Sequence, residues 1–233
     1  MVVPLLIAAV VGYLLGSLPF GYLVARAKGV NIFEVGSKNP GATNVRRVLG
    51  HGPGNLVLAL DMLKGMLAVG WVVFIAQSSV RAFGAPGAHN GWYAMIGSVE
   101  ISNSDHAQLQ MITGLVASIL GHSFSCFTRF RGGKSVATGA GGFAVLFPLG
   151  MAIALGVFLL TLAISRYVSL SSMLGAASLP FAAFAFKQGS PMISVSAVIA
   201  AFVIYRHRAN ILRIRAGTES KVGRKNAGAP IPS

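Results

Sequence analysis

Residues 135–165 read SVATGAGGFAVLFPLGMAIALGVFLLTLAIS, a run of 31 residues without a charged side chain. This run can form one long membrane helix or two short ones, and Pro148 and Gly150 near its middle favour a break. Two helices of about a dozen to fifteen residues each would fall short of the ~20 that a perpendicular crossing needs, so local thinning or a partly re-entrant hairpin is expected. The choice decides on which side of the membrane all later residues lie.

The distribution of positive charge settles this choice. With two helices the chain has seven spans, and all of its 19 lysines and arginines except Arg81 and Lys187 fall in loops on one side. With one helix, Arg166 and the basic tail move across, and the two sides carry nearly equal numbers. Because cytoplasmic loops are rich in Lys and Arg, the sequence predicts seven spans, an N-terminus outside and a C-terminus in the cytoplasm.

Composition assigns the class of protein. Hydrophobic residues make up 54% of the 233 residues and charged residues 10%, and the mean hydropathy is +0.70. This is typical of a polytopic all-α membrane bundle and excludes a soluble protein; long apolar runs argue against a barrel. Orientation and anionic substrates explain the net charge of +14 without a nucleic-acid partner. The lone Cys126 excludes an internal disulfide and a cysteine-rich metal site.

We therefore expect one membrane domain over residues 1–233. The first apolar run reads as a retained helix rather than a signal peptide, and Leu18-Pro19 weakens it. Residues 78–110 form a predicted extracytoplasmic loop, and residues 220–233 a flexible basic tail. In the second span Asp61 and Lys64 are three apart and can pair, which is a structural rather than a catalytic reading.

The first polar cluster is the stretch VGSKNPGATNVRRVLG at residues 35–50. Asn39 can cap a short helix, Pro40 suits its first position and Gly50 its end. Helical spacing then places Thr43, Asn44 and Arg47 on one face, beside a helix N-terminus that attracts anions. This pattern is typical of a phosphate or carboxylate site; the alternative is an amphipathic connector whose arginines touch lipid headgroups.

The second cluster, RFRGGK at residues 129–134, combines positive charge with close backbone approach at Gly132-Gly133. It is not a nucleotide P-loop, because Thr128 stands where that motif needs glycine. The alternative is a basic loop that only sets topology.

The third cluster, RHRANILRIRAGTE at residues 206–219, continues the last span. His207 and Asn210 share one face, and the histidine can carry protons or simply form interfacial hydrogen bonds. Ser169, Ser171 and Ser172 are either helix caps or substrate contacts. His122 lies near the same surface, whereas His89, Glu100, Asp105 and His106 lie on the opposite side, so no metal set is predicted. The three clusters together favour a polyanion site that an acyl chain can enter from the bilayer.

Several motifs jointly resemble the PlsY family of bacterial acyl-phosphate:glycerol-3-phosphate acyltransferases. They are GSLPFG (16–21), VGSKNPGATNVRR (35–47), DMLKG (61–65), GHSF (121–124), FRGGK (130–134), YVSLSS (167–172), HRAN (207–210) and GTE (217–219). The resemblance implies a compact seven-helix fold in the bacterial inner membrane with its active site at the cytoplasmic face. It also implies acyl transfer from fatty acyl phosphate to the 1-hydroxyl of glycerol 3-phosphate, giving lysophosphatidic acid and phosphate.

The family roles carry over residue by residue. Catalytic roles fall on Ser37, Arg47, Lys134, His207 and Asn210. Substrate binding falls on Asn39, Thr43, Asn44, Gly132, Gly133, Ser171 and Ser172, and Glu219 is the structural acid that pairs with a base. No metal or cofactor is implied, because acyl phosphate is already activated; the implied partners are the two substrates, membrane lipids and, transiently, the enzyme that supplies acyl phosphate.

Three features depart from the family pattern. Ser125-Cys126 replaces a proline-containing sequence, Ser135 replaces glycine, and the 78–110 loop is long. We expect the two serine replacements to loosen the phosphate loop. The base that deprotonates the glycerol hydroxyl is either His207 or the substrate's own phosphate. The rival function is a transporter or scramblase for phosphate esters, although no internal repeat is visible.

Overall fold

The computed structural model describes residues 2–83 and 105–223, and all regular secondary structure in these two ranges is helical. The chain forms two compact units, residues 1–152 and 153–233, with the division inside one helix. The helices of unit 1 are α1 (Val2–Ser17), α2 (Phe20–Arg26), α3 (Ala42–Leu49), α4 (His51–Phe83), α6 (Asp105–Ser123), the short 3-10 helix η1 (Cys126–Thr128) and α7 (Val136–Leu146). Helix α8 (Pro148–Ser165) joins the units, and unit 2 continues with α9 (Val168–Ala185), α10 (Ser190–Arg206) and α11 (Arg208–Arg215).

Several of the described helices have the length and composition of membrane spans, which confirms a polytopic all-α membrane protein. Five segments qualify on their own, and a sixth does if the bent pair α10 and α11 counts as one span. The five are Val2–Arg26, His51–Val73, His106–Thr128, Pro148–Ser165 and Val168–Ala185. The apolar helix α7 has 11 residues and is shorter than a span. The count of seven, the orientation of the termini and the single domain stay predictions.

The predicted break in residues 135–165 is present. Helix α7 ends at Leu146, Phe147 leaves the helical conformation with a φ of −148°, and Pro148 opens α8. Proline suits this first position because the N–H that it lacks would have no partner there. The expected lengths need correction, because α8 has 18 residues and is long enough to span.

The predicted 78–110 loop is too long at both ends. Helix α4 continues to Phe83 and α6 begins at Asp105, so residues 78–83 and 105–110 are helical; residues 84–104 lie outside the described part. The start of the predicted flexible tail also needs correction, because the Val222 N–H donates a hydrogen bond to the Arg166 carbonyl at 2.9 Å. Residues 224–233 lie outside the described part.

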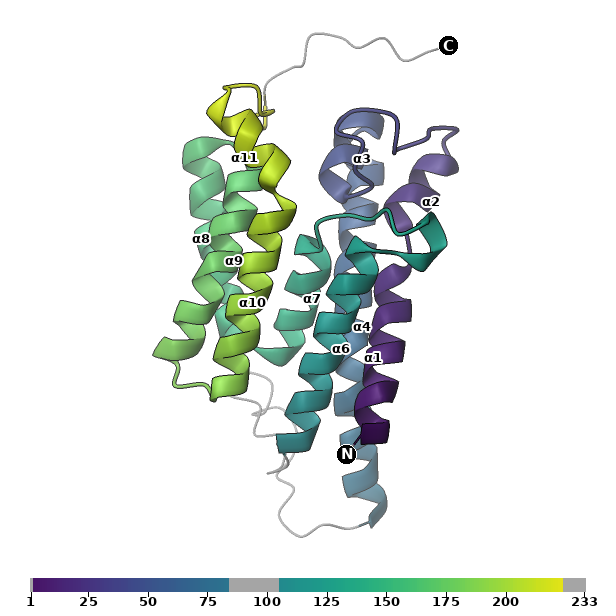
Figure 1. Ribbon diagram of the computed structural model, residues 1–233, viewed down its shortest axis with the longest axis vertical. Helices are drawn as coiled ribbons and strands as arrows, with labels where there is room; N and C mark the ends of the chain where they lie inside the picture. Colours follow the sequence, from purple (N-terminus) through teal and green to yellow (C-terminus); the bar gives the residue numbers. More distant parts are fainter. Residues whose placement is uncertain (1, 84–104, 224–233) are drawn as a thin grey trace. The chain divides into compact units, whose positions relative to one another are not determined.

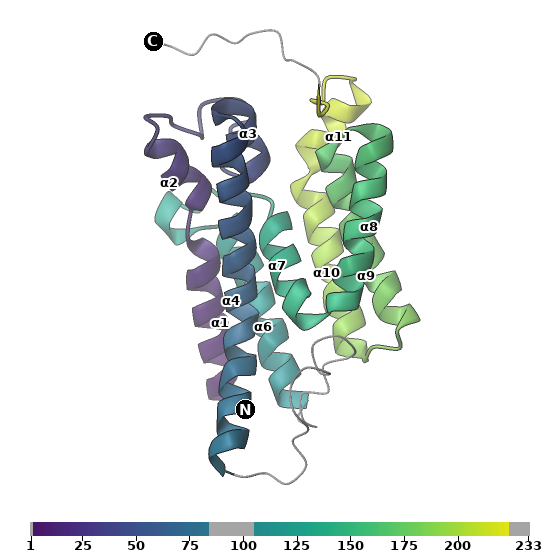
Figure 2. The same ribbon diagram turned by 180° about the vertical axis from the view of Figure 1, so that it is seen from behind.

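The helices of unit 1 pack through small residues. Helix α1 lies beside α6 and α4, and α4 lies beside α7 (Figures 1 and 2). A Cβ atom added to Gly16 would collide with the Ser118 carbonyl of α6, and one added to Gly65 would collide with the Thr138 carbonyl of α7. Backbones therefore touch directly, which is the packing that drives helix association in lipid.

Unit 2 is built around α9. Helix α9 packs against α10, and a Cβ added to its Gly175 would lie 2.9 Å from the Ala154 carbonyl of α8. Helices α10 and α11 meet at a bend of 56°, with His207 between them. The bend brings α11 and the residues after it back toward the start of α9, where Val222 bonds to Arg166.

Candidate active site

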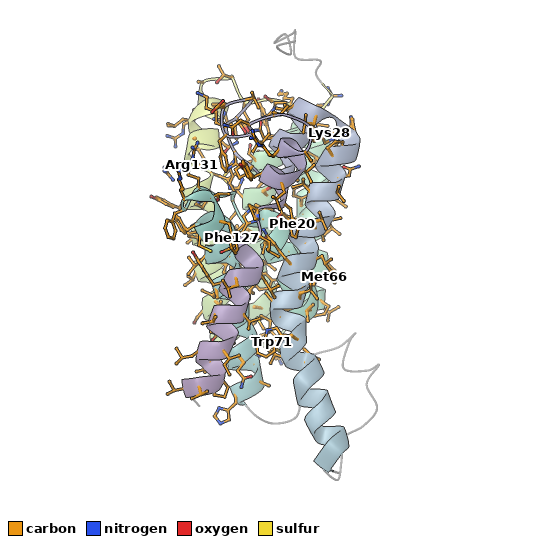
Figure 3. All side chains as sticks on the ribbon, turned by 90° about the vertical axis from the view of Figure 1, so that its right-hand side faces the viewer. Phe20, Lys28, Met66, Trp71, Phe127 and Arg131 are labelled. Carbon is orange, nitrogen blue, oxygen red and sulfur yellow. The ribbon has the colours of Figure 1, made fainter. Side chains whose placement is uncertain are left out.

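The first two polar clusters meet at one end of unit 1. The chain between α2 and α3, α3 itself and the loop after α6 all lie toward the end of unit 1 opposite the start of α1 (Figure 1). Lys28 and Arg131 mark this end in Figure 3, while Met66 and Trp71 lie further down α4. A small apolar core of Ala25, Ile32, Phe33, Val45 and Val57 holds the chain between α2 and α3 in place.

Helix α3 begins two residues later than Pro40 suggests. Its N-cap is Gly41, not Asn39, and Gly41 is extended with a ψ of 157°. The Asn39 side chain instead accepts a hydrogen bond from the Gly41 N–H at 2.9 Å, which makes a turn before the helix. Gly50 ends the helix as predicted, with a φ of +89° that few other residues adopt.

Asn44 organises the first cluster from inside. Its buried side-chain oxygen accepts hydrogen bonds from the Ser37 N–H at 2.8 Å and from Arg47 Nη1 at 3.3 Å. Its side-chain nitrogen donates to the Val35 carbonyl at 3.1 Å. Asn44 thus fixes the loop that carries Ser37 and orients Arg47. Thr43 and Arg47 are exposed on the same short helix.

The second cluster is a loop laid on the end of α6. The Gly133 N–H donates to the His122 carbonyl at 3.0 Å. Cβ atoms added at Gly132 or Gly133 would collide with the His122 carbonyl or with its ring nitrogen Nε2, so both positions require glycine. The Arg131 guanidinium lies 4.5 Å from the centre of the Phe33 ring, which connects this loop to the first cluster. Lys134 is half-buried.

The expectation that Ser125 and Ser135 loosen this loop is wrong. The Ser125 hydroxyl donates to the Ser17 carbonyl at 2.6 Å, and the Ser135 hydroxyl donates to the Ile119 carbonyl at 2.7 Å. Ser135 also lies 2.7 Å from the Ser123 hydroxyl. Both serines are buried, so these hydrogen bonds tie the loop to α1 and α6.

A small pocket lies between this loop and the break that separates α1 from α2. Ser17, Phe20, Lys64, His122, Arg131 and Gly132 are among the residues that line it. Its volume of about 10 Å³ holds roughly one water molecule. Glycerol 3-phosphate is far larger than this volume.

In unit 2, polar side chains of the third cluster contact Glu219. The carboxylate accepts hydrogen bonds from Ser169 Oγ at 2.8 Å, Asn210 Nδ2 at 2.6 Å and Arg213 Nε at 2.7 Å. Burial raises the pKa of Glu219, but the hydrogen bonds from Asn210, Arg213 and Ser169 and the charge of Arg213 outweigh it, so the pKa lies below its ordinary value. The ion pair with Arg213 is the kind that the sequence resemblance implies.

His207 sits at the bend before α11 and is buried. Its Nδ1 lies 2.8 Å from the Val203 carbonyl, which can only accept a hydrogen bond. Nδ1 therefore carries the proton of the neutral ring, and Nε2 is the nitrogen that can take another.

The serines of α9 are not caps. Tyr167 is the N-cap of α9, and no side chain caps the helix there. Ser171 and Ser172 lie inside the helix and donate to the carbonyls of Tyr167 and Val168, each at 2.8 Å. Ser169 contacts Glu219 instead.

Comparison with known proteins identifies the family. The model of the glycerol-3-phosphate acyltransferase family matches residues 6–217. The chain is 42% identical over 222 residues to a glycerol-3-phosphate acyltransferase of Thermosynechococcus vestitus, covering 92% of this chain and 93% of that one. It is 44% identical over 218 residues to the enzyme of that name from Trichormus variabilis, covering 93% and 91%. The chain belongs to this family.

Solved structures of PlsY, an integral membrane glycerol 3-phosphate acyltransferase, share the fold. The glycerol 3-phosphate form is 35% identical with a TM-score of 0.75, covering 94% of this chain and 96% of that one. The lysophosphatidic acid form is also 35% identical, with a TM-score of 0.72 and coverage of 94% and 95%.

The sequence analysis of this member of the glycerol-3-phosphate acyltransferase family missed the contact of His122 with the Asp61–Lys64 pair. Asp61 and Lys64 pair as predicted, at 2.9 Å, but His122 joins them, with Nδ1 3.5 Å from Asp61 Oδ1. The sequence did offer a clue to this contact: ionisable groups inside apolar spans are costly, so they are expected to lie next to polar or charged partners. Among the described residues no group of three His, Cys, Asp or Glu is placed to hold a metal ion.

Proposed function

We propose that this chain transfers a fatty acyl group from acyl phosphate to the 1-hydroxyl of glycerol 3-phosphate. The hydroxyl oxygen forms a bond to the acyl carbonyl carbon, the bond from that carbon to the phosphate oxygen breaks, and the hydroxyl proton passes to a base. The products are lysophosphatidic acid and inorganic phosphate. The observation that carries this proposal is the likeness, over 94% of this chain, to solved PlsY structures in glycerol 3-phosphate and lysophosphatidic acid forms.

The clusters of unit 1 supply the positive charge that this reaction needs. Both substrates carry phosphate, and about four negative charges must be screened before they meet. Arg47, oriented by Asn44, and Lys134, next to the backbone of Gly132 and Gly133, provide this screening. Ser37, Asn39 and Thr43 orient the substrates from the turn and from the exposed face of α3. Because acyl phosphate is already activated, positioning and screening provide most of the catalysis.

The residues of unit 2 supply the candidate base. Nε2 of His207 accepts the hydroxyl proton in this proposal, with the substrate's own phosphate as the alternative acceptor. Asn210, Ser171 and Ser172 act as polar groups beside it. The hydrogen bond from Nδ1 to the Val203 carbonyl supports the assignment, since it fixes the tautomer in which Nε2 carries the lone pair.

The proposed setting is the bacterial cytoplasmic membrane, crossed seven times, with the active site at the cytoplasmic face. Acyl phosphate enters from the bilayer, and an enzyme that supplies it associates transiently. The concentration of Lys and Arg in predicted cytoplasmic loops supports this orientation.

The experiment is phosphate release by the purified, detergent-solubilised protein. Palmitoyl phosphate is supplied with and without glycerol 3-phosphate, and lysophosphatidic acid is measured alongside. We expect release that depends on glycerol 3-phosphate and yields equal amounts of both products. A folded, monodisperse protein that makes no product would favour a transporter or scramblase of phosphate esters.

Replacing Arg47 tests the first cluster. We expect Arg47→Ala to lower kcat/KM by about 100-fold, because a charge-assisted contact to a phosphate disappears. The matched control is Arg46→Ala, which removes an exposed arginine next to it on α3 and should leave the rate within about twofold. Equal losses in the two variants would refute a specific role for Arg47.

A further inference from the structure

A buried polar network lies beneath the glycine loop and has no part in the proposed chemistry. Asp61 and Lys64 of α4 have side chains only 3% exposed, and they pair at 2.9 Å. Nδ1 of His122 lies 3.5 Å from Asp61 Oδ1 and 3.1 Å from the Thr138 hydroxyl of α7. The network therefore joins α4, α6 and α7 in the interior of unit 1.

The same network reaches the break in the first span. Lys64 Nζ donates to the Leu18 carbonyl at 2.8 Å, one of the carbonyls next to Pro19. Phe20, after the break, lies beside it, with its ring centre 5.6 Å from Nζ, and Figure 3 shows Phe20 at middle height in unit 1. The Lys64 ammonium group is thereby held between the Asp61 carboxylate and the Leu18 carbonyl.

His122 connects this network to the Gly132-Gly133 loop. Its carbonyl accepts the Gly133 N–H, and the Nε2 edge of its ring lies where a Gly133 side chain would start. Contacts to Asp61 and Thr138 hold the opposite edge of the ring. Because the His122 ring is fixed at its Nδ1 edge and packs against Gly133 at its Nε2 edge, it determines how far the Gly132-Gly133 loop lies from α6.

We propose that His122 is a positioning residue, oriented by Asp61 and Thr138, that holds the backbone of Gly132 and Gly133 in the conformation that binds a substrate phosphate. The inference rests on the proposed function, in which this loop faces such a phosphate. Burial of an ion pair stabilises little by itself. A fixed support for a loop that must bind an anion with backbone groups explains why charged residues occupy this interior.

Two substitutions separate the two edges of the ring. The amide of glutamine reaches the position of Nε2 and supports Gly133, whereas the amide of asparagine reaches only the position of Nδ1. We expect His122→Asn to raise the KM of one phosphate-bearing substrate by about tenfold, as for the loss of one well-placed contact, with kcat within about threefold. His122→Gln keeps a group at the position of Nε2 but loses the Nδ1 contacts to Asp61 and Thr138, so its KM should rise by less, staying within about threefold of the wild type.

Ser118→Ala is the control, because Ser118 is buried on the same helix and its hydroxyl donates a hydrogen bond to the Leu115 carbonyl of that helix. Its KM values should match the wild type. Lower kcat with unchanged KM values in His122→Asn, or equal behaviour of the Asn and Gln variants, would overturn the inference.

Amide hydrogen exchange of the segment 125–136 gives a readout that does not depend on activity. We expect at least about tenfold faster exchange at Gly133 in His122→Asn than in the wild type, the Ser118→Ala variant and His122→Gln. Unchanged exchange in His122→Asn would overturn the inference. If the wild type makes no lysophosphatidic acid, the proposed function fails, while this measurement still tests whether His122 holds the loop.

Discussion

Ser135 adopts a backbone conformation that side chains rarely take, with a φ of +60° at the start of α7. The left-handed region costs a residue other than glycine about 1–2 kcal/mol. Hydrogen bonds from the buried hydroxyl to the Ile119 carbonyl and with Ser123 offset this cost. The same position therefore accommodates serine here and glycine in the pattern of the family.

Two substitutions at Ser135 should differ in stability. Ser135→Ala keeps the strained conformation and loses the hydrogen bonds, so the free energy of unfolding should fall by about 2 kcal/mol. Ser135→Gly loses the same bonds but relieves the strain, so its stability should stay within about 1 kcal/mol of the wild type. Thermal unfolding in detergent measures both, and a glycine variant no more stable than the alanine variant would contradict this account.

Spacing along a helix predicted contacts within α3 and α4 but not contacts between helices. The Asp61–Lys64 pair and the shared face of Asn44 and Arg47 follow from positions three apart. That Asn44 is buried and bonded to Ser37 depends on how the preceding loop folds back. His122 and Asp61 are far apart in the sequence, so only the packing of α4 against α6 brings them together.

At the scale of elements, Glu219 contacts two helices of unit 2, α9 and α11. It contacts Ser169 at the start of α9, Asn210 in α11 and Arg213 one turn later. Its side chain is 6% exposed. The Glu219 carboxylate and the hydrogen bond from Val222 to Arg166 thus both hold the chain after α11 against the start of α9.

The pKa of Glu219 makes this junction sensitive to acid. The folded-state pKa is below the ordinary value of 4.5, so the ionised carboxylate adds stability above about pH 4.5, and this stability is lost as the pH falls through the folded-state value. We expect the melting temperature of the wild type to fall below about pH 4.5. Glu219→Gln should melt lower at neutral pH and lose less on acidification. Parallel pH curves for the two proteins would contradict the assignment.

The ends of the elements were the hardest to predict. Proline and glycine marked the break after α7 because they act through local backbone chemistry. Residues 78–83 and 105–110 are polar or weakly apolar, so hydropathy placed them in a loop although they continue α4 and α6. Asn39 resembled a cap, but Gly41 is the N-cap and Asn39 instead bonds to its N–H.

For the whole molecule, the orientation in the membrane is the open prediction, and Cys126 tests it. This cysteine is the single one in the chain and is exposed in η1. Because the neighbouring loop 129–134 is predicted to be cytoplasmic, a membrane-impermeant thiol reagent should label Cys126 in inside-out vesicles and not in intact spheroplasts.

A second position provides the control for labelling. Ser220→Cys, combined with Cys126→Ser, places the thiol after the last helix, where we expect the same sidedness. Labelling of either cysteine from outside the cell would refute the predicted orientation. Hydropathy alone predicted the class of fold. The orientation in the membrane could be predicted only from the distribution of charge, since helix packing does not distinguish the two faces of a membrane.

The glycine contacts of unit 1 determine which mutations the protein tolerates. At Gly16 and Gly65 a single methyl group meets a neighbouring backbone, whereas large residues such as Leu6 and Ile164 are 59% and 78% exposed. Truncating such an exposed leucine removes few contacts within the protein, whereas adding one carbon between the helices separates two backbones. Sequence drift is therefore freer at such exposed bulky residues than at the glycines packed between helices.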